Sequence, residues 1–286
     1  MEVRGATPDR SVADERSMKL IALEYHDVVT PGGWSSSGFT GPGSASYKLL
    51  TSEFDAHLDA VREVALPHTD GVLDVIARGL SRPREALLFT FDDGGVSAYR
   101  EIAPRLERHG WRGHFFIATD FLGLPGFMTP AELRELSARG HVIGTHSCSH
   151  PLRMTAQSHA VLEREWKQSA DVLADVLGKP TTVGSIPGGS LSRAVGAAAA
   201  RAGLRALFTS EPVMRTASVD GCVLLGRFTL RRWSDATVVA ALAQGRAAAR
   251  MRQWTKWNAA KLAKAVGGTA YLHVRQWLME RALPKS

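Results

Sequence analysis

The chain contains 286 residues, of which 44% are hydrophobic and 22% are charged. This length is enough for one large α/β domain or two small ones. Only two cysteines occur, so the composition implies no disulfide framework. The polar first 18 residues lack the apolar core of a secretory signal, and no stretch approaches the ~18 apolar residues of a membrane-spanning helix. We therefore expect a loose tail at 1–18 and a cytoplasmic protein.

The net charge of +7 is concentrated towards the C-terminus. Residues 231–286 contain 11 Lys and Arg but only 2 Asp and Glu. The basic character therefore belongs to the C-terminal segment, and the preceding part of the chain is close to neutral.

Short apolar runs alternate with amphipathic segments between residue 19 and about residue 228. The runs predict strands at 19–25, 87–91, 113–118, 141–145, 181–186, 205–209 and 222–228. The amphipathic segments predict helices at 50–64, 97–109, 130–139, 155–177 and 191–202. This alternation gives a parallel sheet, and six or seven repeats favour closure into a barrel. We expect a distorted (β/α) barrel domain at 19–233, followed by a helical basic extension at 234–286.

Residues 30–46 form a long segment rich in Gly, Ser and Pro. A loop of this length inside a compact domain often acts as a lid. Its two large aromatic residues, Trp34 and Phe39, either cover a bound substrate or pack the loop against the domain.

Acidic and imidazole side chains follow two of the expected strands. Asp92 and Asp93 end the run at 87–91, and adjacent buried carboxylates repel each other unless a cation lies beside them. His146 and His150 follow a later strand. Because strand ends meet at one face of a barrel, two imidazoles and one carboxylate there suit Zn2+ or another divalent first-row metal. Taken separately, the aspartates would cap the next helix and the histidines would be surface groups.

Three short motifs stand at expected strand ends: Thr90-Phe91-Asp92-Asp93-Gly94, His146-Ser147-Cys148-Ser149-His150 and Pro187-Gly188-Gly189. Together they resemble the motifs of the NodB-type polysaccharide deacetylases, carbohydrate esterase family four. The resemblance implies that Asp93, His146 and His150 bind a divalent metal, with Zn2+ first and Co2+ or another first-row metal as alternatives. It implies that Asp92 is the general base, that the Gly188 N–H stabilises the oxyanion, and that the barrel is of the NodB type.

Two features depart from the family pattern. The family carries an Arg shortly before the third motif, where it orients the base, but residues 184–186 read Gly-Ser-Ile. The family's Leu-x-His motif with the general acid is also missing, and we interpret Tyr271-Leu272-His273 as an accidental match. Some members resemble a circular permutation that places this histidine near the N-terminus. We therefore predict that His26, after the first strand, is the general acid; the alternative is a structural histidine bonded to backbone.

Other potentially reactive side chains are expected to be structural. His146 and His150 on either side of Cys148 are expected to converge on the metal. The Cys148 side chain should therefore point away from the metal and pack in the domain. His114, His141 and His159 lack matching partners and are expected to be structural or surface groups. Trp233 either walls the sugar pocket or packs in the core.

The C-terminal extension mixes tryptophans with basic residues, namely Trp254, Trp257, Tyr271 and Trp277 with Arg246, Arg250, Arg252, Lys256, Lys261 and Lys264. Helices of this composition can lie on an anionic membrane surface. The alternative is that they pack on the barrel with a solvated basic face. Nucleic-acid binding is not expected, because no recognisable motif accompanies the charge.

These features predict a metal-dependent hydrolase that removes an N-acetyl group from an amino sugar in a glycan, glycolipid or lipid-linked polysaccharide precursor. The polar N-terminus favours a substrate made on the cytoplasmic side, with the protein at the inner face of the membrane. Two alternatives stay open. One is a carbon–nitrogen hydrolase for a non-sugar amide or cyclic imide, and the other is an inactive barrel that binds a glycan.

Overall fold

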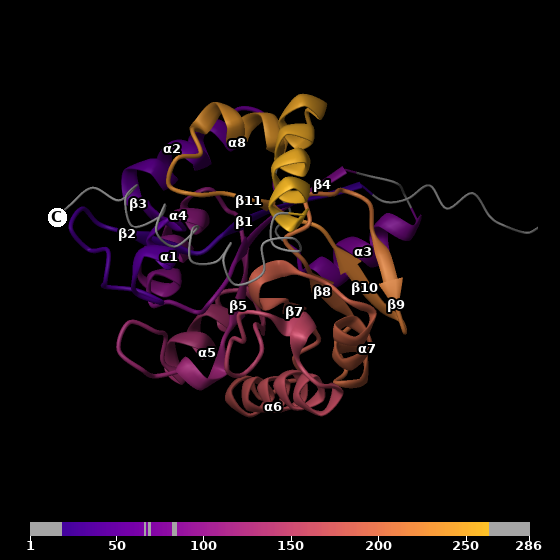
Figure 1. Ribbon diagram of the computed structural model, residues 1–286. Coiled ribbons are helices and arrows are strands. Elements are labelled where there is room, and N and C mark those ends of the chain that lie inside the picture. The colour runs from indigo at the N-terminus through magenta and orange to yellow at the C-terminus, as the bar shows by residue number, and fades with distance from the viewer. Residues whose placement is uncertain (1–18, 66, 68–69, 82–84, 263–286) are drawn as a thin grey trace, which may run out of the picture.

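The computed structural model describes residues 19–65, 67, 70–81 and 85–262 (Figure 1). Within this part of the chain, nine strands form one curled sheet. Their bounds are Lys19–Tyr25 (β1), Glu85–Phe91 (β4), Gly113–Ile117 (β5), Val142–Thr145 (β6), Val183–Ser185 (β7), Ala206–Phe208 (β8), Ala217–Val219 (β9), Cys222–Leu225 (β10) and Phe228–Thr229 (β11). The order across the sheet is β11-β1-β4-β5-β6-β7-β8-β10-β9.

Neighbouring strands run parallel, except that β9 and β10 are antiparallel. Gly226 and Arg227 link β10 directly to β11, so the chain itself brings the two ends of the curled sheet together. The expected distorted (β/α) barrel is confirmed, but the expected single strand at 222–228 is wrong, because it divides at this link. A Cβ at Gly226 would lie 2.4 Å from Glu211 O and Val213 O, so only glycine fits there.

Helices surround the sheet (Figure 1). Their bounds are Pro42–Ala45 (α1), Thr51–Arg62 (α2), Val72–Ser81 (α3), Ala103–Arg108 (α4), Pro130–Ala138 (α5), His159–Leu177 (α6), Arg193–Arg201 (α7) and Ala236–Ala243 (α8). Short helical turns lie at Ala98–Ile102 (η1), Thr119–Phe121 (η2), Met154–Ala156 (η3) and Pro187–Gly189 (η4), and a two-stranded parallel sheet pairs Asp27–Val29 (β2) with Lys48–Leu50 (β3). A further helix is described over 247–262. None of the described helices is long and apolar enough to cross a bilayer.

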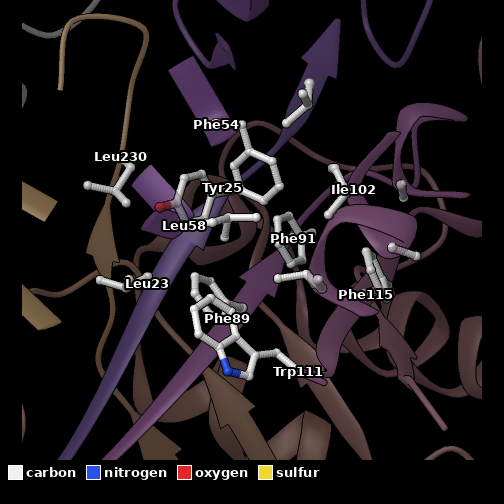
Figure 2. Close-up of a cluster of buried hydrophobic side chains, with 14 of the residues drawn as sticks. Leu23, Tyr25, Phe54, Leu58, Phe89, Phe91, Ile102, Trp111, Phe115 and Leu230 are labelled. Atoms are coloured by element: carbon white, nitrogen blue, oxygen red, sulfur yellow. The ribbon is translucent and has the colours of Figure 1, made fainter. Parts of the chain in front are cut away.

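The outer face of the sheet packs against the surrounding helices. In β1, the alternate residues Ile21, Leu23 and Tyr25 are buried in the largest hydrophobic cluster. The Tyr25 ring centre lies 5.3 Å from that of Phe54 in α2 and 5.6 Å from that of Phe91 in β4. Figure 2 shows these three rings side by side in the cluster. This period-two pattern fixes which side chains of each strand face inward.

The inner face is apolar at one end and polar at the other. Leu20 and Ala22 of β1 share a second buried cluster with Leu88 of β4, and α3 closes this end of the barrel through Val72 and Val75. Continuing the same alternation along the strands brings Glu24, Thr90 and Asp92 to the inner face at the carboxyl edge, and all three are buried. The strand pattern therefore assembles the polar groups at one end of the barrel.

His114 of β5 illustrates how this interior responds to pH. The ring is buried, and the Val72 N–H donates a 3.0 Å hydrogen bond to His114 Nε2. Burial lowers the pKa of His114 to about 4. The unfolded chain therefore binds more protons than the folded protein between pH ~6.5 and pH ~4, so folding stability falls as the pH falls through this window.

We expect His114→Gln to reduce this acid sensitivity, because a glutamine carbonyl can accept the Val72 bond but cannot be protonated. A shift of this size corresponds to roughly 3 kcal/mol over the window. Urea denaturation at pH 7 and pH 4.5 should show a smaller loss of stability in the variant than in the wild type. His159→Gln, at an exposed position of α6, is the control and should keep the wild-type slope. If His114→Gln loses as much unfolding free energy between pH 7 and pH 4.5 as the wild type, His114 is not the source of the acid sensitivity.

Candidate active site

Asp93, His146 and His150 converge just beyond the carboxyl ends of β4 and β6. Asp93 Oδ1 lies 3.5 Å from His146 Nε2 and 3.4 Å from His150 Nε2, and one ligand atom from each residue lies within 4.8 Å of the other two. Asp93 Oδ1 is buried and has no hydrogen-bond partner in the described part of the chain. Two atoms each ~2.1 Å from a tetrahedral Zn2+ would be roughly 3.4 Å apart, so these side chains fit a divalent cation.

The backbone and a hydrogen bond orient the two imidazoles. Ser147 and His150 have φ angles of 64° and 54°, and Asp93 has a φ of 77°, a conformation that costs non-glycine residues about 1–2 kcal/mol each. His146 Nδ1–H donates to Ser185 O at 2.9 Å, which leaves the Nε2 lone pair directed at Asp93. Burial lowers the pKa of His146 to about 4, so the ring is neutral at pH 7 and available as a ligand.

Glu165 of α6 holds the loop between the two histidines. Its buried carboxylate accepts hydrogen bonds from the N–H groups of Cys148 at 3.0 Å and Ser149 at 2.9 Å. The Ser149 hydroxyl donates a third bond at 2.7 Å. Cys148 itself is buried, with Sγ 3.4 Å from Glu165 O, so it packs against α6 as the sequence predicted.

Arg227 holds Asp92 through two parallel hydrogen bonds, from Nη1 to Oδ1 and from Nη2 to Oδ2, each 2.7 Å long. Both side chains are buried. Ser185 Oγ donates to Asp92 Oδ2 at 3.2 Å and accepts from Arg227 Nη2 at 2.8 Å. Burial raises the pKa of Asp92, but the charge of Arg227 outweighs it and holds this pKa well below its usual range. Residues 184–186 contain no arginine to orient Asp92. Arg227 and Ser185 make this contact instead.

His26 lies beside Asp92. One ligand-type atom from each of Glu24, His26 and Asp92 lies within 4.8 Å of the other two. His26 Nδ1 is buried without a partner, and no ring-to-backbone hydrogen bond of His26 occurs within the described ranges. The His26 ring instead lies 4.5 Å from the Tyr47 ring. The structure therefore places His26 at the same strand edge as the other candidate residues, with one nitrogen free.

Gly188 in η4 has a φ of 68°, and a Cβ there would lie 3.1 Å from Leu152 O. The loop at 30–46 also reaches the site, because the Phe39 ring lies 4.9 Å from the His150 ring. The same loop is tied to the domain, since Lys48 Nζ donates to Trp34 O at 2.8 Å. Trp233 is 64% exposed, so the alternative that it packs in the core is wrong.

The structure thus brings together Asp92, Asp93, His146, His150 and His26. Sequence reasoning missed Arg227 and Glu165. Both are charged residues among apolar neighbours, and a buried charge requires a partner, so their position in the sequence could have indicated a role. His114 and His141 are buried and hydrogen-bonded, whereas His159 is exposed. The Tyr271-Leu272-His273 segment lies outside the described residues, as do Lys264 and Trp277 of the basic extension.

Comparison with known proteins relates part of the chain to a family and its fold to solved structures. Residues 80–207 match the family model described as polysaccharide deacetylase. The structure is similar to IcaB from Ammonifex degensii (TM-score 0.65, 23% identity, 79% of this chain and 97% of that chain). It is also similar to the deacetylase PplD from Streptococcus pyogenes in complex with acetate (TM-score 0.63, 20% identity, 77% of this chain and 96% of that chain).

A curated relative, an uncharacterized 30.6 kDa protein from Geobacillus stearothermophilus, is 28% identical over 101 residues. That match spans 35% of this chain and only 36% of the relative. The chain is therefore similar to the polysaccharide deacetylases over residues 80–207, and its described part has the fold of these two deacetylase structures.

We expect Arg227→Gln to lower the free energy of unfolding at pH 7 by about 3–5 kcal/mol, because it leaves Asp92 and Glu24 buried without their counter-charge. Arg227 depresses the folded-state pKa of Asp92, so its stabilisation is present above the unfolded pKa of about 4 and is lost as the pH falls through the folded value. The difference between wild type and variant should therefore narrow below pH ~4, as measured by urea denaturation.

Arg139→Gln is the matched control for that experiment. Arg139 also contacts a carboxylate through two nitrogens, but its partner Glu107 and Arg139 itself are 28% and 26% exposed. Partly exposed ion pairs contribute little, so we expect a loss below about 1 kcal/mol. Equal losses in the two variants would contradict the importance of burial at Arg227.

We expect Glu165→Ala to weaken Zn2+ or Co2+ binding by roughly 10–100-fold, because the loop that carries His146 and His150 loses three hydrogen bonds. Glu165→Gln should retain most of the affinity, since one amide oxygen can accept the two backbone bonds and the amide nitrogen can donate to Ser149 Oγ. Glu163→Ala, two residues away and exposed, is the control. Competition titration with a chromophoric chelator measures the affinity, and wild-type binding by Glu165→Ala would contradict this role.

Proposed function

We propose that this chain is a metal-dependent de-N-acetylase of an amino sugar in a glycan, glycolipid or lipid-linked polysaccharide precursor. The observation that carries the proposal is the convergence of Asp93, His146 and His150 beside an Asp92 carboxylate that is held by Arg227. The match of residues 80–207 to the polysaccharide deacetylase model and the similarity in fold to a solved deacetylase support deacetylation as the reaction. A simple glycan-binding role would not require this buried set of charged groups, whose burial costs free energy.

Each residue has a distinct chemical task in this proposal. Asp93, His146 and His150 hold a divalent ion, with Zn2+ as first choice and Co2+ or another first-row metal as alternatives, which when bound acidifies water and polarises the acetamide carbonyl. Asp92 accepts the proton of the attacking water, and its lowered pKa keeps it ionised throughout the neutral range. Arg227 and Ser185 fix the direction of the Asp92 oxygens towards the reacting atoms.

His26 and Gly188 act on the other atoms of the amide. His26 donates a proton to the leaving nitrogen, because an imidazole can carry and release a proton near neutral pH. The Gly188 N–H stabilises the negative charge that develops on the carbonyl oxygen. The products are acetate and a free amine on the sugar. PplD has a similar fold and was solved in complex with acetate, which supports acetate as the acid product.

The location of the reaction is part of the proposal. We propose that the protein works in the cytoplasm, on a precursor presented at the inner face of the membrane. The exposed Trp254 and the basic residues of the described helix at 247–262 support peripheral contact with anionic lipid.

The proposal is tested by acetate release from N-acetylhexosamine compounds with added Zn2+ or Co2+. Wild type should release acetate, and Asp93→Ala should lose both metal and activity. Asp92→Asn and His26→Gln should each keep the metal while losing roughly 10²–10⁴-fold in turnover, the usual contribution of a general base or acid. A His26→Gln variant with near-normal turnover would remove His26 from the mechanism.

Other results would point to other functions. A folded wild type that binds metal but releases no acetate, and instead opens a cyclic imide, would assign the imide-type reaction. A wild type that binds neither Zn2+ nor Co2+ and releases no acetate would refute the deacetylase proposal and favour a glycan-binding barrel.

A further inference from the structure

The short segment at 230–234, between β11 and α8, borders the candidate active site. The Leu230 N–H donates to Glu24 O at 2.8 Å, and the Arg232 N–H donates to Ser46 O at 3.2 Å. Arg231 N–H donates to Ser234 Oγ at 3.0 Å and closes the segment into a turn. These bonds fix the segment beside the end of β1, where His26 follows.

Arg231 lies one aromatic ring away from His26. Its guanidinium carbon is 4.5 Å from the centre of the Tyr47 ring, and Nη2 donates to the Tyr47 hydroxyl at 2.8 Å. The His26 ring also contacts Tyr47, and the two ring centres lie 4.5 Å apart. Tyr47 therefore holds a positive charge close to the proposed general acid.

Arg232 and Trp233 extend the same edge. The Arg232 guanidinium carbon lies 4.1 Å from the centre of the Trp34 ring. Trp233 lies 5.8 Å from the Arg231 guanidinium and leaves 64% of its surface exposed. A large exposed indole ring beside a site is costly in water and is suited to cover an apolar face of a ligand.

The guanidinium groups of Arg231 and Arg232 have no carboxylate partner in the part of the chain that the structure describes. Within the described ranges, no Asp or Glu oxygen lies within 4.0 Å of either group, in contrast to Arg105, Arg139 and Arg227. Stacking on Tyr47 and Trp34 fixes their positions while most of their N–H donors stay free. Two neighbouring residues whose guanidinium groups lack a carboxylate within the described ranges favour the binding of an anion at this edge.

We infer that Arg231, Arg232 and Trp233 form a subsite for a sugar that carries a negative charge, either a phosphate or a carboxylate. The guanidinium fork matches the geometry of both oxyanions, and Trp233 stacks on the sugar ring that bears them. This inference rests on the proposed deacetylase function and names its substrate class as acidic N-acetylated sugars. Neutral N-acetylglucosamine polymers are then the poorer substrates.

The test compares three sugars in the presence of Co2+: N-acetylglucosamine, its 1-phosphate, and a disaccharide of N-acetylglucosamine with glucuronic acid. We expect wild type to deacetylate at least one anionic sugar with a kcat/KM roughly 10-fold or more above that of the neutral sugar. The preference should shrink when salt is raised, because the contact is partly exposed. The phosphate and the uronate distinguish the two sources of negative charge.

The double variant Arg231→Gln/Arg232→Gln should bring the ratio of anionic to neutral kcat/KM close to one. Arg108→Gln, an exposed position on α4, is the control and should keep the wild-type ratio. Thermal unfolding checks that the double variant is folded. A double variant that retains the preference, or a wild type that shows none, would overturn the inference.

Calorimetric titration of both anionic sugars separates this inference from the proposed function. If wild type binds an anionic sugar and the double variant does not, while no acetate appears, the subsite stands and the deacetylase proposal fails. If all three sugars are deacetylated equally well and bound equally, the deacetylase proposal stands and the subsite is refuted.

Discussion

The paired hydrogen bonds between Arg227 and Asp92 hold together the two parts of the molecule that form the site. Asp92 ends β4, whereas Arg227 occupies the link between β10 and β11, 135 residues further along the chain. Arg227 pairs with the buried carboxylates of Glu24 and Asp92, so together with the buried Asp93 these four side chains carry a formal charge of −2 before any ion binds. A divalent cation at Asp93, His146 and His150 would restore neutrality, so charge balance and ligand geometry indicate the same occupant.

Strand periodicity explains why these groups share one location. Each strand alternates between an outer face that packs on helices and an inner face that fills the barrel. The inner positions are apolar where α3 closes the barrel and polar at the carboxyl edge, as at Leu88, Thr90 and Asp92 of β4. Helix α6 then fixes the histidine loop from outside through Glu165. The site is therefore supported by regular elements on both sides, although its reactive groups stand on loops.

The local parts of this arrangement could be predicted from sequence, and the long-range parts could not. Asp92 and Asp93 share one strand end, and His146 and His150 share one short loop, so spacing alone indicates their convergence. Arg227 appears in sequence as a single arginine in an apolar run, and only the curl of the sheet shows that it reaches Asp92. Helix α3 was missed, although its apolar residues recur at helical spacing and Val72 and Val75 form its buried face.

The distribution of charge differs between the interior and the edge of the site. Inside, carboxylates exceed cationic side chains, and a divalent ion held by Asp93, His146 and His150 would balance this excess of negative charge. At the edge, aromatic rings position Arg231 and Arg232, and no carboxylate among the described residues pairs with either of them. The rings of Tyr47 and His26 lie between Arg231 and the buried carboxylates, so these charges do not pair with each other. Arg231 and Arg232 at the edge would therefore attract an acidic sugar, while its neutral acetamide enters the interior. A negatively charged group in the interior would be repelled by Asp92 and Glu24.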